Sequence, residues 1–392
     1  MAAALPDSVS LYVHVPFCTR RCHYCDFAVT ASADPPIRDW LEALAEDLNQ
    51  WQAELGTPRL PRLDTIFVGG GTPSLLGAAG MEGLRRLLED RFPLDPGTIE
   101  WTAEANPNSL TLDTARAWRE AGVNRLSLGV QSFDDRALQW LGRLHDRNEA
   151  SGAIERARAA GFENLSIDLI FGLPTGVARS WRDDLEHAME LAVPHLSAYG
   201  LTAEHRTALG SWVSAGRVQM PDQEQYEREY LTAVEILEMH DLKHYEVSNF
   251  ATSGHECRHN WHYWIGSEYL GVGPSSHSFV GGRRSWNVRE WSAYRLAARE
   301  RSSVREGHEE PTPEQRRLES LWLGLRTRRG IELARFGIPE RAVASWIGAG
   351  RAVLAGGRLR LTSRGWLLLD ELVTELSARD DEAGDPVNGG RA

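Results

Sequence analysis

Cysteine is scarce in this chain, and its placement matters more than its number. Only four cysteines occur among 392 residues, and three of them cluster at Cys18, Cys22 and Cys25. A disulfide framework needs several paired cysteines and an oxidising compartment, so this usage excludes a disulfide-stapled fold. Reduced thiols are instead available to bind metal, which favours a cytoplasmic protein.

The chain also lacks long apolar runs and an excess of positive charge. No window reaches the roughly 18 apolar residues of a membrane-spanning helix, and residues 1–10 lack the basic and apolar regions of a secretion signal. The net charge of −12 repels phosphate, so we expect no general binding to nucleic acid. A hydrophobic fraction of 42% and this length suit a large soluble domain with a smaller one.

The three clustered cysteines have the spacing C-x3-C-x2-C and follow a segment with strand composition. Residues 11–15 are β-branched and aromatic, and Pro16 ends the strand that they predict. Three thiolates on such a loop can hold three irons of a four-iron cluster, which leaves the fourth iron open to an exchangeable ligand.

A zinc site is the alternative for these thiols, with His14 or His23 as the fourth ligand. Structural zinc sites usually combine two short cysteine or histidine knuckles that lie far apart in the sequence. The chain has no second knuckle of this kind, so we favour the cluster.

Strand-like and helical segments alternate over the first two hundred residues. Six segments read as buried strands: residues 11–15, 64–68, 98–105, 123–130, 165–171 and 195–201. This alternation predicts parallel strands with right-handed crossovers. Six units do not fill an eight-stranded barrel, so we predict an α/β fold with a partial (β/α)6, TIM-like barrel. A doubly wound sheet is the alternative, but its G-x-G-x-x-G fingerprint does not follow the first strand.

Polar or glycine residues stand where these strands end. They include the cysteine loop, the glycines at 69–71, Glu104, Gln131 and Asp168. Carboxyl ends of parallel strands converge on one face of a barrel, where active sites form. Each residue alone has a structural explanation, such as a turn, a helix cap or an ion pair. Together with the cysteines, they predict one site.

The cysteine motif, with Tyr24 before its last cysteine and Phe27 closing it, resembles that of the radical S-adenosylmethionine (SAM) superfamily. The resemblance implies a [4Fe-4S] cluster held by the three cysteines, with SAM on its open iron. Further motifs resemble the oxygen-independent coproporphyrinogen III oxidase family over most of the chain. These motifs lie at Tyr12, 69–73 (GGGTP), 104–107 (EANP), 129–132 (GVQS) and 167–174 (IDLIFGLP).

The same resemblance implies the residues that contact SAM. Glycines let the backbone approach the methionyl group, carboxylates suit its ammonium or the ribose hydroxyls, and an arginine suits its carboxylate. The implied SAM contacts are Tyr12, Tyr24, Gly70, Gly71, Thr72, Glu104, Gln131, Arg143, Asp168 and Gly200.

This chain departs from the oxidases in two ways that match the related HemW branch, whose members are haem chaperones. The oxidases carry a further cysteine where this chain has Phe27, and they have a longer N-terminal extension. We therefore predict a protein that binds haem and transfers it to an acceptor, rather than one that decarboxylates coproporphyrinogen. The alternatives are the oxidase itself, which converts propionates to vinyls, and a barrel that keeps the cluster only as structure.

Residues 259–264 fit H-N-x-x-Y-W, a signature of the HemW branch that is associated there with haem. His259 can ligate haem iron, and neighbouring indoles can stack on a porphyrin. The alternative is a packed segment that closes the open side of the barrel. Cys257 reads as a small buried residue rather than a ligand.

We predict four regions. Residues 1–205 form the radical SAM barrel, 206–287 close it, 288–377 form an oxidase-like, winged-helix-like α+β domain without DNA binding, and 378–392 form a disordered tail. The expected partners are haem, an unidentified acceptor protein and, through peripheral contact, haem proteins of a membrane. A flavodoxin or ferredoxin would supply electrons if SAM is cleaved.

Overall fold

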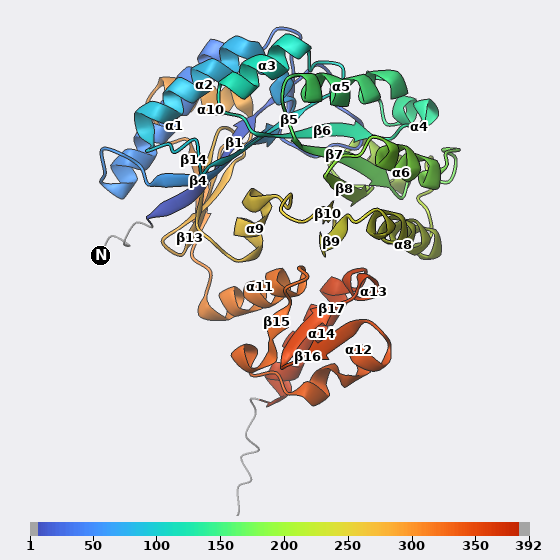
Figure 1. The fold of residues 1–392 in the computed structure, drawn as a ribbon. Coiled ribbons are helices and arrows are strands. Elements are labelled where there is room, and N and C mark those ends of the chain that lie inside the picture. The colour runs from blue at the N-terminus through green and yellow to red at the C-terminus, as the bar shows by residue number, and fades with distance from the viewer. Residues whose placement is uncertain (1–6, 384–392) are drawn as a thin grey trace, which may run out of the picture.

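A single twelve-stranded sheet forms the main body of the computed structural model, which describes residues 7–383 (Figure 1). Its strand order is β14-β13-β12-β11-β1-β4-β5-β6-β7-β8-β10-β9. The six central strands are parallel neighbours and confirm the six predicted ones. They are β1 (Ser8–Val15), β4 (Arg62–Gly70), β5 (Glu100–Ala105), β6 (Arg125–Gln131), β7 (Asn164–Phe171) and β8 (His195–Gly200). The sheet curves but stays open, as a partial barrel does.

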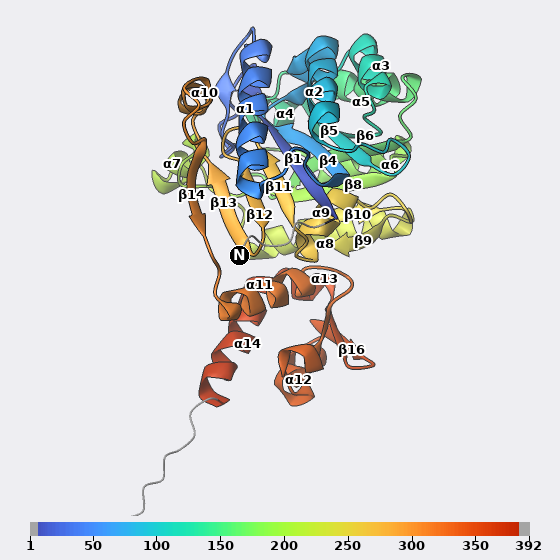
Figure 2. The same ribbon diagram turned by 90° about the vertical axis from the view of Figure 1, so that its left-hand side faces the viewer.

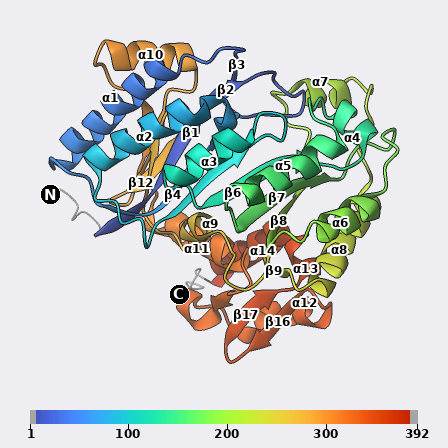
Figure 3. The same cartoon turned by 45° about the horizontal axis from the view of Figure 1, so that its top comes forward.

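Helices cover the convex face of this sheet in a row (Figures 1 and 3). They are α1 (Ile37–Leu55), α2 (Gly77–Arg91), α3 (Leu112–Glu120), α4 (Asp135–Trp140), α5 (Arg147–Ala159), α6 (Trp181–Glu190) and α8 (Gln223–Met239), with the short α7 (Ala208–Ser214) beyond the strand ends. Strand periodicity explains the two faces, since alternate side chains point to opposite sides. In β1, Leu11 and Val13 are buried in the core that α1 contributes to, whereas Tyr12 and His14 face the concave side.

Further strands, each antiparallel to the next, extend the sheet beyond both ends of the six central strands. On one side β11 (Tyr269–Val272) pairs in parallel with β1, and β12 (His277–Val280), β13 (Arg283–Asn287) and β14 (Arg305–Glu309) follow. On the other side lie β10 (Asn249–Ala251) and β9 (Lys243–Glu246). The predicted closing segment therefore supplies both flanks of the sheet without joining them.

The C-terminal unit has its own small sheet and its own core, and lies below the main sheet in Figures 1 and 2. Helix α11 contacts α9 (Arg258–Trp264) of the main body. The elements of this unit are α11 (Pro313–Leu325), β15 (Ile331–Glu332), α12 (Ala344–Gly348), β16 (Ala352–Ala355), β17 (Arg358–Leu361), α13 (Ser363–Trp366) and α14 (Leu369–Ala383). Short helices with an antiparallel hairpin match the winged-helix-like expectation.

The structure differs from the predicted regions at two boundaries. Helix α10 (Trp291–Arg299) packs on α1, and β14 pairs with β13, so both belong to the main body although they follow residue 288. The second core starts at Leu321. Helix α14 runs on to Ala383 through the first part of the predicted tail, whose remainder, residues 384–392, lies outside the described residues. Of the helices in residues 7–383, none has the length and apolar character needed to cross a membrane.

The cysteine loop is tied to the end of β4 by backbone hydrogen bonds. The amide of Gly71 donates to the carbonyl of Val15 over 2.7 Å, and the amide of Thr72 donates to that of Phe17 over 2.7 Å. A Cβ on Gly71 would lie 2.5 Å from the Phe17 carbonyl oxygen and 2.8 Å from that of Val15. A glycine at this position is therefore required for the loop to approach β4.

We expect Gly71→Ala to detach the cysteine loop from β4, because backbone atoms cannot yield to the added methyl group. Overpacking of this kind costs about 1–3 kcal/mol of unfolding free energy, measurable by chemical denaturation. Gly348→Ala is the matched control, since a Cβ there meets nothing within 4 Å. Equal stability and equal iron content of the two variants would contradict this role for Gly71.

Candidate functional site

The carboxyl ends of the parallel strands and the cysteine loop enclose a cavity of ≈ 650 Å³. It brings together the three clustered cysteines and nine of the ten residues predicted to contact SAM. These nine are Tyr24, Gly70, Gly71, Thr72, Glu104, Gln131, Arg143, Asp168 and Gly200. The tenth, Tyr12, lines a neighbouring chamber. The convergence of parallel strand ends on one face therefore produces the gathering that the sequence predicts.

The three thiols are free and half-buried on the wall of this cavity. Burial raises the pKa of Cys18 to about 11 and also raises the pKa of Cys25. Such thiols become thiolates when a metal replaces their protons. The loop thus presents three ligands to one space, as a four-iron cluster requires.

The zinc alternative finds no complete ligand set in residues 7–383. No three His, Cys, Asp or Glu side chains there gather closely enough to hold one metal ion. His14 is engaged on both ring nitrogens, with Nε2 at 2.9 Å from the Ala28 carbonyl and Nδ1 at 3.0 Å from the Tyr12 hydroxyl. His23 packs its ring against Trp140. The hydrogen bonds of His14 therefore disfavour it as a fourth zinc ligand.

A chain of hydrogen bonds links two of the cysteines through polar side chains that follow β4, β5 and α4. The Thr72 hydroxyl donates to Cys18 Sγ over 3.4 Å, and Asn106 Nδ2 donates to Thr72 Oγ1 over 3.1 Å. Arg143 Nη2 donates to Asn106 Oδ1 over 2.6 Å, and its Nη1 lies 3.9 Å from Cys22 Sγ. Asn106 is missing from the predicted contacts, although it stands two residues after Glu104 in the same strand-end motif.

Two carboxylates, Glu104 and Asp168, lie in the same cavity. Glu104 Oε2 accepts from the Gly70 amide over 3.1 Å, and Asp168 Oδ1 accepts from the Ser127 hydroxyl over 3.2 Å. Burial, followed by the negative charge of Asp168, raises the pKa of Glu104 to about 8. Burial also raises the pKa of Asp168. A cationic ligand between them would relieve this repulsion, because opposite charge favours ionised carboxylates.

Backbone geometry at the remaining strand ends is also specialised. Gln131 has a φ of +71°, a left-handed conformation that non-glycine residues rarely adopt. Gln131 is the last residue of β6, and it lines the cavity. At Gly200, an added Cβ would lie 1.8 Å from the Tyr226 hydroxyl of α8. A side chain at this position would therefore displace the Tyr226 ring.

His259 lies away from the cysteines, at the amino-terminal ends of the strands. It is buried in α9, with Nδ1 at 2.7 Å from the Thr65 hydroxyl and Nε2 at 3.0 Å from the Tyr263 hydroxyl. Its amide donates to Glu100 Oε1 over 3.1 Å. The adjacent Cys257 is buried, and burial raises its pKa to about 12. Helix α9 thus packs across the floor of the partial barrel, and His259 lines neither cavity.

Comparison with known proteins identifies the fold and its relatives. The profile of the Radical SAM superfamily matches residues 12–188. Heme chaperone HemW of Mycobacterium tuberculosis is 38% identical over 93% of this chain and 94% of its own length. Heme chaperone HemW of Bacillus subtilis is 38% identical over 83% of this chain and 86% of its own. The chain belongs to the HemW family. Membership of this radical SAM family implies a [4Fe-4S] cluster and SAM.

A solved structure shows the same fold as this HemW relative over nearly its whole length. Coproporphyrinogen III oxidase (HemN) of Escherichia coli superposes with a TM-score of 0.81, covering 96% of this chain and 92% of the oxidase. The identity is 20%, so the likeness shows the fold alone. The predicted partial barrel with a C-terminal domain is confirmed.

We expect Cys22→Ala to abolish the brown absorbance and bound iron of the reconstituted protein, because the loop then offers only two thiolates. Cys257→Ala serves as the matched control, since this thiol is buried away from the loop. The measurement is iron and sulfide content together with the visible spectrum. Iron retained by the Cys22 variant, or zinc found in a colourless wild type, would contradict the cluster.

We expect Glu104→Gln to flatten the pH dependence of stability in SAM-free protein. The folded pKa of about 8 exceeds the usual 4.5, so the folded state binds more protons and the wild type loses stability as pH rises between these values. At pH 8 the variant should melt a few °C higher than the wild type, with the difference vanishing near pH 4.5. If the melting temperatures of the two proteins change equally from pH 5 to 8, the raised pKa of Glu104 would be refuted.

Proposed function

We propose that this chain is a haem chaperone that binds haem and transfers it to an acceptor protein. The observation that carries the proposal is the near full-length match to HemW relatives, which are named heme chaperones. The cavity supports the proposal, because the three thiols lie together with two carboxyl groups and a guanidinium, which suit the opposite charges of SAM. The cluster and SAM would occupy this cavity while haem is carried beside it.

In this proposal Cys18, Cys22 and Cys25 would hold the cluster, whose open iron would be available to SAM. Glu104 and Asp168 would supply negative charge for the cationic parts of SAM. Their pKa values are raised in the empty cavity, so a bound cation would favour their ionised forms. A reduced cluster supplies the electron that can cleave the SAM sulfonium.

The other side chains of the cavity would place SAM and protect it. Arg143 offers its guanidinium to a carboxylate, and the backbone of Gly70 and Gly71 can approach the methionyl group closely. Thr72 and Asn106 hold Arg143 in place through the hydrogen-bond chain to Cys18.

The enzymatic alternative, oxygen-independent coproporphyrinogen III oxidase, has weaker support. The likeness to the oxidase structure concerns the fold alone. At the position where the oxidases carry a further cysteine, Phe27 exposes 62% of its surface beside the cluster loop. An apolar ring there favours a surface for a flat ligand over the oxidase arrangement.

Further parts of the proposal concern surroundings and partners. The chain would work in the cytoplasm, with an unidentified haem-accepting protein and peripheral contact to haem proteins of a membrane. A flavodoxin or ferredoxin would reduce the cluster where SAM is cleaved.

One pair of assays separates the chaperone from the oxidase. We expect anaerobic, cluster-loaded protein to bind haem in about equimolar amount in an absorbance titration. The same protein with SAM, a reductant and coproporphyrinogen should yield no protoporphyrinogen. Turnover of coproporphyrinogen would overturn the chaperone proposal, and so would the absence of any haem spectrum.

A further inference from the structure

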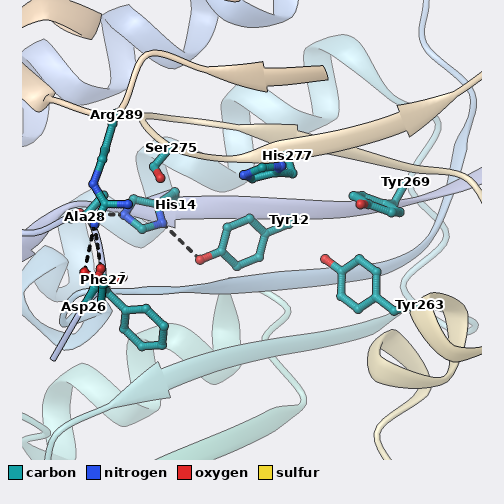
Figure 4. A pocket seen from close by; sticks show the side chains of 10 residues that line it. All are labelled: Tyr12, His14, Asp26, Phe27, Ala28, Tyr263, Tyr269, Ser275, His277 and Arg289. Carbon is teal, nitrogen blue, oxygen red and sulfur yellow. Dashed lines mark hydrogen bonds and ion pairs between the residues drawn. The ribbon is translucent and has the colours of Figure 1, made fainter. Parts of the chain in front are cut away.

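A second chamber of ≈ 390 Å³ lies on the concave side of β1, β11 and β12 (Figure 4). It adjoins the cavity that the three clustered cysteines line. The two spaces share Asp26 and Phe27 of the cysteine loop as lining residues. Its volume is in the lower part of the roughly 300–1,000 Å³ range of small-molecule sites. A ligand in this chamber would therefore lie next to the loop that holds the cluster.

Aromatic rings from distant parts of the chain line this chamber. Tyr12 comes from β1, Tyr263 from α9 and Tyr269 from β11, and Phe27 projects from the cysteine loop (Figure 4). The Tyr263 and Tyr269 rings meet edge to face at 4.7 Å between centroids. Flat faces of this kind suit a large planar ring, since aromatic surfaces gain most from stacked or edge contacts.

Two histidines reach this chamber, and they differ in availability. Both nitrogens of His14 are already hydrogen-bonded, and the residue is 4% exposed. The His277 side chain at the start of β12 is exposed and lines the chamber, with its ring centroid 6.1 Å from that of Trp286. Within residues 7–383, its ring makes no hydrogen bond. Partial burial, then the charge of Arg284, lowers the pKa of His277. Its neutral imidazole can therefore bind a metal at pH 7.

Positive charge lies at the loop end of the chamber. Arg289 Nη2 donates to the Asp26 carbonyl over 2.6 Å and lies 3.5 Å from the Asp26 carboxylate (Figure 4). A guanidinium has five donors, so this pairing leaves others for a second carboxylate. The chamber thus combines an available imidazole, aromatic walls and a guanidinium, which correspond to the iron, the macrocycle and the propionates of haem.

We propose that haem binds in this chamber, with the His277 imidazole on its iron and a propionate beside Arg289. The proposal deepens the proposed function and rests on it. Haem would then lie between the cysteine loop and strands β11 and β12.

The H-N-x-x-Y-W segment acquires an indirect role in this arrangement. Its His259 has both ring nitrogens engaged beneath the sheet, and one of them holds the Tyr263 hydroxyl at 3.0 Å. Tyr263 in turn lines the chamber. His259 is thus a positioning residue that orients a wall of the haem site, which fits an effect on haem binding without ligation.

The test is a titration of ferric haem into anaerobic, cluster-loaded full-length protein, read by the Soret band and by electron paramagnetic resonance. His277→Ala should weaken haem binding at least tenfold and remove the histidine-type signature, and added imidazole should restore that signature. His277→Met should keep binding but change the spectrum. His308→Ala, which changes an exposed histidine on β14, two strands away from β12, should match the wild type.

The propionate contact has its own control. Arg289→Gln should weaken binding of haem several-fold but leave binding of haem dimethyl ester unchanged, because the ester lacks the negative charges. Wild-type affinity and spectrum in both His277 variants would overturn the assignment while leaving haem binding itself intact. A wild type that binds no haem would instead defeat the proposed function. Loss of the histidine signature in His259→Ala but not in His277→Ala would move the iron to α9 and overturn our site.

Discussion

Two backbone hydrogen bonds, from Gly71 and Thr72 at the end of β4 to the start of the cysteine loop, hold the functional site together. They form because residue 71 has no side chain, since a Cβ would stand 2.5 Å from a carbonyl oxygen. This constraint sets where all three thiols lie relative to the other strand ends. It also brings Thr72 to Cys18, from which the polar chain to Arg143 starts.

Charge in the cavity is arranged for a ligand rather than for the stability of the empty protein. Burial raises the pKa values of Glu104 and Asp168 although the positive charge of Arg125 opposes the shift at both carboxyl groups. Arg143 lies across from them and is hydrogen-bonded to Asn106. Such an arrangement is costly until a molecule with both charges occupies it, which is the property expected of a SAM site.

The proposed haem site depends on surfaces that the cluster site leaves free. The exposed Phe27 side chain lines both the cysteine-lined cavity and the second chamber. Helix α9 contributes Tyr263 to the second chamber. The antiparallel strands beyond β1 add His277. The second chamber is formed jointly by β1 and the cysteine loop, within the radical SAM match, and by α9, β11 and β12, which follow it.

The sequence by itself determined the six parallel strands, the cysteine loop and the residues at the strand ends. Each of these is a local pattern of periodicity or spacing, and the topology of parallel strands then brings the ends together. Only the tertiary structure decided the rest. The pairing of β1 with β11 joins Tyr12 to Gly271, and hydrophobic periodicity does not specify partners so far apart. For the same reason, the burial of His259, the place of α10 and β14 in the main body and the second chamber follow from long-range packing.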